Sequence, residues 1–336
     1  MIHQTFRYHL WNFSVTSDFD LGDLDRAGSG IAADHMSVHR VEQSDCAQPS
    51  TPPLFEDYFE NGDVWFSSWQ ISDDVYLIRF PGSCAFRIFP EKMRIDCAPE
   101  SDIDNATIAH LTLDHAIPRL LSLTPGFVVL HACAFQIENQ VVAVLGQSGQ
   151  GKSTLAGWFA SQGFPLLTDD CLVVRWDKNA GQWLAQPSYH SVRLWPDSVD
   201  ALGIPSSKLR AFSGYSSKRR TGREVDFRFA SAGAPLSACF LLPEQPSTSG
   251  PVALHSGPPR IRPLSVNEAF LGLARSVFRV DVDNQQLNRR EFEVLTSLTA
   301  SVRFWSLEYE RKYDWLPIVQ AAMIKAIEDP SEKDQR

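Results

Sequence analysis

The stretch VVAVLGQSGQGKSTLAGWFASQGFPLLTDD, residues 141–170, decides the fold. Its first five residues are all apolar, and directly after them Gly146 begins a segment that matches the pattern G-x-x-x-x-G-K-[ST] as far as Ser153. In such a strand–loop–helix context, glycines allow the tight backbone path that turns successive N–H groups onto phosphate oxygens. The stretch therefore predicts a phosphate-binding loop (a Walker A motif, or P-loop) within an α/β fold.

The other residue types of this loop fit the same chemistry. Lys152 supplies a full charge for the β- and γ-phosphates, and the start of the following helix adds a partial positive charge. The Ser153 hydroxyl is a hard oxygen ligand suited to Mg²⁺. We therefore expect ATP and Mg²⁺ as cofactors. The residues predicted to bind the nucleotide are Gly146, Ser148, Gly149, Gln150, Gly151, Lys152, Ser153 and Thr154.

Asp169 and Asp170 form a second acidic element at an informative distance from the loop. The predicted helix over 153–162 has ten residues and runs about 15 Å away from the phosphates. A strand of about five residues returns about 17 Å, which brings both carboxylates back beside Lys152. One of them can then hold Mg²⁺ while the other accepts a proton from an incoming hydroxyl. A surface Asp-Asp turn is the alternative interpretation.

The order and spacing of these features resemble the C-terminal domain of the HPr serine kinase/phosphatase family, whose nucleotide site is related to that of phosphoenolpyruvate carboxykinase. The resemblance covers 125–245 and rests on His131 in the preceding strand, GQSGQGKSTLA at 146–156 and GFPLLTDDCLVV at 163–174. A softer resemblance, over about 55–328, is to the HPr-kinase-like proteins found with peptide-modifying gene sets, including lasso-peptide kinases. It rests on LHA before the loop strand and on RLWP at 193–196.

The resemblance implies roles for individual residues. It implies that Asp169 is the general base, that Asp170 and Ser153 contact the metal, and that His131 lies near the transferred phosphate; these roles of the two aspartates could be exchanged. Without the resemblance, a lone histidine on an apolar strand is more often a packed core residue. Arg193 occupies a region where a substrate or phosphate contact is expected. Because HPr kinases are hexamers, the resemblance also favours a homo-oligomer.

A run of basic residues at 206–224 reads as a mobile loop. The planar guanidinium group of arginine forms paired hydrogen bonds with phosphate and carboxylate groups. This loop could therefore close over ATP or bind an acidic substrate segment. Lys218 and Arg219 are the best candidates for that contact, and a solvated charge run is the alternative. We expect the tryptophans at 195, 305 and 315 to belong to the core rather than to stack on a ligand.

The chain divides into three predicted parts. Residues 1–124 form a β-rich region with a loop or disordered stretch at about 17–53, residues 125–245 the P-loop core on a mixed sheet, and residues 246–336 an α-rich region that completes it. Strands are predicted at 5–15, 64–69, 75–80, 84–89, 93–97, 127–137, 141–145, 165–167, 172–176, 192–195, 225–229, 236–242, 252–255 and 302–309. Helices are predicted at 103–122, where Pro118 should kink or split the helix, and at 153–162, 265–277, 287–300 and 314–328.

Composition excludes several classes of protein. The 336 residues carry 40 acidic and 31 basic side chains, a net charge of −9, so binding to nucleic acid or to an anionic membrane by overall field is not expected. No apolar run reaches the length of a spanning helix, and the N-terminus lacks the features of a secretion signal, which favours the cytoplasm. The six cysteines form no C-x-x-C pair and should be reduced core residues.

Together these patterns predict an ATP- and Mg²⁺-dependent kinase that phosphorylates a serine-type hydroxyl on a peptide or protein. A lasso-type precursor peptide is the most specific version of this hypothesis. A kinase acting on a small alcohol or amino acid, and a non-catalytic ATP-binding regulatory partner, remain as alternatives. The intact pair of aspartates argues against the last of these, because a pure binder needs no base.

Overall fold

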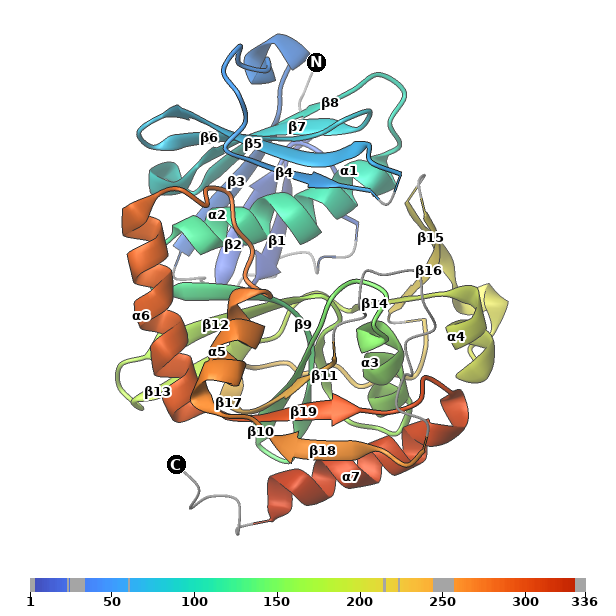
Figure 1. The fold of residues 1–336 in the computed structure, drawn as a ribbon. Coiled ribbons are helices and arrows are strands. Elements are labelled where there is room, and N and C mark those ends of the chain that lie inside the picture. Colours follow the sequence, from blue (N-terminus) through green and yellow to red (C-terminus); the bar gives the residue numbers. More distant parts are fainter. Residues whose placement is uncertain are drawn as a thin grey trace.

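Two large β-sheets, with helices between and around them, make up the chain (Figure 1). This computed structural model describes residues 4–22, 24, 34–59, 61–213, 216–222, 224–243 and 257–329. The strands are β1 (Phe6–Leu10), β2 (Phe13–Ser17), β3 (Asp34–Arg40), β4 (Phe55–Tyr58), β5 (Val64–Ser72), β6 (Val75–Phe80), β7 (Cys84–Phe89), β8 (Arg94–Pro99), β9 (Phe127–Ile137), β10 (Gln140–Leu145), β11 (Leu166–Thr168), β12 (Cys171–Asp177), β13 (Gln182–Gln186), β14 (Ser191–Leu194), β15 (Arg210–Ser213), β16 (Ser216–Gly222), β17 (Ala234–Leu241), β18 (Arg260–Pro263) and β19 (Arg303–Glu308). The helices are α1 (Asn105–Leu111), α2 (Ile117–Leu123), α3 (Lys152–Ser161), α4 (Pro196–Ala201), α5 (Val266–Ala274), α6 (Gln285–Ser301) and α7 (Leu316–Glu328).

The N-terminal sheet has the strand order β1-β2-β3-β8-β7-β6-β5-β4. The predicted antiparallel meander is confirmed in β5 to β8. The expectation of a loop or disordered stretch at about 17–53 is wrong for residues 34–40, because β3 lies parallel to both β2 and β8 and pairs with them through hydrogen bonds. Met36 and Val38 alternate into the core there, a period-two pattern hidden among the polar neighbours. Residues 23 and 25–33 lie outside the described part of the chain.

Helices α1 and α2 lie between the two large sheets (Figure 1). They are joined by a π-helical turn at Thr112–Ala116, which ends two residues before Pro118. Proline has no N–H to donate and its ring crowds the carbonyl four residues earlier, so the predicted interruption takes the form of a wider turn rather than a break. The turn holds Asp114, whose carboxylate accepts a hydrogen bond from Arg193.

The second sheet carries the loop that dominates the sequence. Strands β9 and β10 are buried over most of their length, as their near-continuous apolar sequences predict. β10 pairs antiparallel with β9 and parallel with β17, so the ladder β10-β9-β12-β13-β17 closes on itself, and β19 and β18 extend it. The sheet is therefore mixed, as expected, and the C-terminal third of the chain completes it.

The predicted strand–loop–helix unit is present at 140–161. After β10 the chain turns through Gly149 and Gly151, which have φ angles of +79° and +90°, and α3 begins at Lys152. Only glycine adopts such angles without steric cost, so these two positions explain the glycines of the motif. From α3 the chain returns through β11, and Asp169 and Asp170 follow at its end.

Three further expectations need correction. Within the basic stretch 206–224, residues 210–213 and 216–222 form the strands β15 and β16 rather than a loop, and β16 also pairs with β14 in a small third sheet. Residues 225–229 form no strand, and only an isolated bridge joins Phe229 to Leu166. Residues 260–263, where no strand was predicted, form β18, an edge strand that β19 stabilises. The strand predicted at 252–255 lies outside the described residues.

Several other elements agree with the sequence, whereas β4, β13 and α4 were not predicted. Helices α5, α6 and α7 and strand β19 occupy the predicted C-terminal positions. The six cysteines are free and buried. The mixed α/β class is confirmed, whereas the assignment to the HPr kinase/carboxykinase type stays a prediction, as do the three domain boundaries. None of the described helices has the length and apolar character needed to span a membrane.

Candidate active site

A cavity of about 190 Å³ lies where the loop, the small third sheet and the segment before α7 meet. It gathers predicted site residues from five separate stretches of the chain. Those that line it are His131, Ser148, Gly149, Gly151, Lys152, Ser153, Thr154, Asp170, Arg193 and Lys218. Of the other predicted residues, Gly146 and Gln150 line a second cavity on the other side of the loop, and Asp169 and Arg219 line neither.

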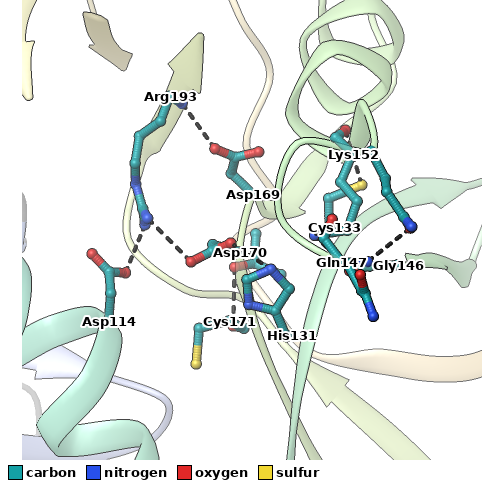
Figure 2. A network of polar contacts seen from close by, with 12 residues as sticks. Asp114, His131, Cys133, Gly146, Gln147, Lys152, Asp169, Asp170, Cys171 and Arg193 are labelled. Atoms are coloured by element: carbon teal, nitrogen blue, oxygen red, sulfur yellow. Dashed lines mark hydrogen bonds and ion pairs between the residues drawn. The ribbon is translucent and has the colours of Figure 1, made fainter. Parts of the chain in front are cut away.

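Lys152 is folded back into the loop. Its Nζ donates hydrogen bonds to the carbonyl oxygens of Gly146, at 2.7 Å, and of Gln147, at 3.0 Å (Figure 2). The residue is only 5% exposed, and this burial lowers the pKa of its ammonium group, although Asp170 opposes the shift. A cationic donor is thus held at the mouth of the loop, and phosphate oxygens could take the place of the two carbonyls.

Asp169 does not line the cavity, and one of its two carboxylate oxygens already accepts a hydrogen bond. Its Oδ2 accepts a hydrogen bond of 2.8 Å from the backbone N–H of Arg193. Its Oδ1 is buried and accepts no hydrogen bond from any described residue. Burial raises the pKa of this carboxyl, against the influence of Arg193 and the Ser153 hydroxyl nearby. A buried oxygen without a donor costs free energy, and a cation would satisfy it.

Asp170 faces the cavity between two cationic or basic groups. Its Oδ2 accepts from Arg193 Nη1 at 3.2 Å, and its Oδ1 lies 3.5 Å from Nε2 of His131 (Figure 2). Burial alone would raise the pKa of Asp170, but His131 and, after it, Arg193 and Lys152 outweigh burial and hold the pKa well below its usual range. Asp170 is therefore ionised at neutral pH.

His131 is neither fully buried nor freely solvated. Its side chain is 31% exposed, and its ring lies 6.0 Å from that of Phe278. Burial lowers the pKa of His131 to about 4, although Asp170 favours its protonation. The imidazole is therefore neutral at pH 7, and it faces the cavity from β9 rather than packing wholly into the core.

Arg193 connects the site to the N-terminal region. Besides Asp170, its guanidinium donates 2.6 Å hydrogen bonds to Asp114 Oδ1 and to the Tyr189 hydroxyl. Asp114 is in turn hydrogen-bonded to Tyr189 and, at 2.6 Å, to Nδ1 of His110. Although burial opposes ionisation, Arg193 and His110 hold the pKa of Asp114 down at about 2. The sequence placed Arg193 as a substrate or phosphate contact, but here its hydrogen bonds run to the site's own carboxylates.

His110, Asp114 and Tyr189 are absent from the residues predicted for this site. A signal existed for two of them: His110 and Asp114 are four residues apart in a helix whose other positions are largely apolar, the spacing at which side chains meet. Two polar residues on a buried helical face require a partner, since buried charge is costly when unpaired. That partner is Arg193, which lies 79 residues further along the chain than Asp114. The local sequence pattern does not identify a partner at such a distance.

Aromatic and cationic side chains also line the cavity. Trp195 is 44% exposed and lines the cavity, so the expectation that it is a core residue is wrong, whereas Trp305 is buried as predicted. Lys218 Nζ lies 5.3 Å from the centre of the Trp195 ring. Arg219 points elsewhere, because adjacent residues of a strand face opposite sides. Arg311, from the segment before α7, donates to the carbonyl oxygen of Gly149 at 3.1 Å.

The cavity carries a surplus of positive charge. Its cations are Lys152, Arg193, Lys218, Arg311 and Lys312, and its carboxylates are Asp170 and Asp197. In a chain of net charge −9, this local excess favours an anionic ligand. Because the excess is centred on a glycine-rich loop at a helix N-terminus, the ligand class that fits is a phosphate ester.

No protein-family model matches this chain. No curated protein matches its sequence either. Among solved structures, the HPr(Ser) kinase/phosphatase from Coxiella burnetii is similar, with 14% sequence identity over 59% of this chain and 96% of that chain, at a TM-score of 0.29. A TM-score this low decides neither the fold nor the activity of this chain.

Proposed function

We propose that this protein is a phosphotransferase that moves the γ-phosphoryl group of ATP to a hydroxyl group, with Mg²⁺ as cofactor. One observation supports it above all: a lysine-bearing glycine loop and an ionised aspartate line one cation-rich cavity. The loop and Lys152 supply positive charge where negative charge develops during phosphoryl transfer. A protein that only binds ATP would need the lysine-bearing glycine loop but not the ionised aspartate.

The residues present fit a magnesium ion. The hydroxyl of Ser153 and the unsatisfied Oδ1 of Asp169 are the oxygen donors that would hold it. Mg²⁺ commonly takes one or two protein oxygens together with substrate phosphates. The described residues hold no group of three or more His, Cys, Asp or Glu side chains able to bind a metal alone, so phosphates would have to complete this site. When bound, the ion neutralises charge on the transferring phosphoryl group.

Asp170 is then the carboxylate placed to receive the acceptor proton, because it lines the cavity and Asp169 does not. This assignment exchanges the roles that the resemblance implied for the two residues. Arg193 keeps Asp170 ionised and oriented, and the neutral imidazole of His131 stands beside it. Such a base acts by positioning the hydroxyl and taking its proton as transfer proceeds.

The acceptor that we favour is a serine-type hydroxyl on a peptide or protein, with a small alcohol or amino acid as the second candidate. The experiment combines the protein with γ-labelled ATP, Mg²⁺ and a size-fractionated extract of its own host, with Asp170→Asn run in parallel. We expect label in a peptide or protein fraction that is lost in the variant. Label confined to small molecules would support the second candidate, and label released only as free phosphate, unchanged in the variant, would contradict a kinase.

Substituting the two aspartates separately tests their roles. We expect Asp170→Asn to lower kcat by about 10²- to 10⁴-fold, the usual contribution of a general base, with little change in ATP affinity. We expect Asp169→Asn to raise the Mg²⁺ concentration for half-maximal turnover by about 10- to 100-fold. Steady-state rates across a Mg²⁺ titration measure both. If Asp169→Asn instead stops transfer at every Mg²⁺ concentration while Asp170→Asn shifts the Mg²⁺ requirement, the roles are those that the resemblance implied.

A further inference from the structure

A second cavity, of about 450 Å³, opens on the other side of the loop. It lies between the ends of β10 and β17, the strands β18 and β19, and helix α5. Figure 1 shows α5 beside these strands of the second sheet. The two cavities share His131 and Ser148 among their lining residues. They therefore meet at the loop, where the γ-phosphate of a bound nucleotide would lie.

The chemistry of the second cavity differs from that of the first. Its lining contains two arginines and two glutamates, so the positive and negative charges cancel. Arg262 and Glu268 form a bidentate salt bridge with hydrogen bonds of 2.8 and 3.3 Å. Four leucines and Pro243 supply apolar surface. A balanced, partly apolar wall does not suit a triphosphate. It suits a ligand without net charge that carries apolar groups.

Gln150 offers this cavity a hydrogen-bond donor. The residue is 3% exposed, and its Oε1 accepts from the backbone N–H of Gln147 at 2.8 Å. Its Nε2 is buried and has no hydrogen-bond partner among the described residues. Because a buried amide nitrogen left unpaired is costly, a ligand with an acceptor oxygen, such as a peptide carbonyl, would satisfy it.

Helix α5 connects this cavity to the surface and to His131. Glu268, Gly272 and Arg275 line the cavity, and Leu271, which is 54% exposed and does not itself line it, lies on the same face of the helix. A Cβ at position 272 would come within 1.8 Å of Leu241 Cδ2, so glycine is required for the close seating of α5 on β17. Just beyond the helix, the Ser276 carbonyl accepts a 2.6 Å hydrogen bond from the backbone N–H of His131.

We propose that the second cavity binds the acceptor, and that the acceptor is a peptide segment with an apolar side chain that rests on Leu271 next to its reactive serine. This proposal rests on the proposed function. In the step itself, a bond forms between the serine oxygen and the γ-phosphorus, and the bond from that phosphorus to the β–γ bridging oxygen breaks. The serine proton passes to Asp170, and ADP leaves.

The test uses γ-labelled ATP and pools of peptides with a central serine, each pool fixing one residue class at one flanking position. We expect wild type to label pools with a fixed apolar residue best. Leu271→Glu should raise KM for these pools about tenfold relative to KM for ATP, the order expected when one apolar side chain loses its contact. The same variant should gain labelling of pools with a fixed lysine or arginine at that position.

Val266→Glu is the matched control, since Val266 is 60% exposed on the same helix but about 140° around it from Leu271. It should keep the wild-type peptide profile. The proposal is overturned if wild type labels the pools without apolar preference, or if Leu271→Glu keeps the wild-type profile. A protein that turns over no ATP and labels no pool contradicts the proposed function instead, and ATP hydrolysis without any peptide labelling contradicts the acceptor site alone.

Discussion

Replacing Lys152 with alanine is expected to lower kcat/KM for ATP by about 10²- to 10³-fold, the cost of removing one donor aimed at developing negative charge. The Lys152 ammonium is held in place by two loop carbonyls at 2.7 and 3.0 Å, so it needs little reorganisation to meet phosphate oxygens. Steady-state kinetics with Mg²⁺ and ATP measure the effect. Thermal unfolding of the same sample shows whether the loop keeps its fold without the lysine.

Lys312→Ala provides the matched control for this prediction. Lys312 lines the same cavity, but its side chain is 64% exposed and paired at 2.6 Å with Glu310. Solvent screens such a charge, so we expect its loss to change kcat/KM by no more than about threefold. Equal effects of the two substitutions would mean that overall charge, and not the position of Lys152 in the loop, attracts the nucleotide.

Replacing Arg193 with alanine is expected to destabilise the fold by about 3–5 kcal/mol, as when one partner of a buried ion pair is removed. The change leaves Asp114 and Asp170 without their shared cation, and both side chains are largely buried, at 3% and 20% exposure. Activity should fall as well, because Asp170 loses the guanidinium that keeps it ionised and oriented. Urea unfolding measures the first effect, and phosphoryl transfer at a temperature where the variant is folded measures the second.

Two further variants distinguish the loss of the buried ion pairs of Arg193 from nonspecific destabilisation of the fold. Arg289→Ala removes an exposed i,i+4 pair with Glu293 and should leave the urea midpoint unchanged. Asp114→Asn combined with Arg193→Ala should destabilise less than the sum of the single changes, because one of the uncompensated charges is gone. Strict additivity of these neighbours would contradict the buried network.

The sequence predicts the part of the molecule that local chemistry determines. The apolar strands, the glycines with positive φ and the return to Asp169 and Asp170 are all local, and each can be derived from residues close together in the chain. Lys218 lines the same cavity as the loop, whereas its predicted contact with ATP or substrate stays a prediction. Its roles, like those of the other site residues, stay proposals.

The features that the sequence did not reveal depend on distant contacts. Strand β3 exists because β2 and β8 flank it on both sides, which no local propensity indicates. The hairpin β15–β16 likewise depends on β14. Asp114 lies within hydrogen-bonding distance of Arg193 because the two large sheets pack around α1 and α2. Trp195 is exposed because its side chain forms part of the wall of the cavity. Pairing over such separations is a property of the fold and not of a motif.

The most direct test of the central claim is calorimetric titration of the intact protein with ATP and with AMP, each with and without Mg²⁺. We predict one ATP per chain, tighter binding with Mg²⁺, and AMP binding weaker by about 100-fold or more, since charge-assisted contacts to the β- and γ-phosphates are missing. Equal affinity for ATP and AMP, or no binding of ATP at all, would contradict the assignment of the loop at 146–153 as a triphosphate site.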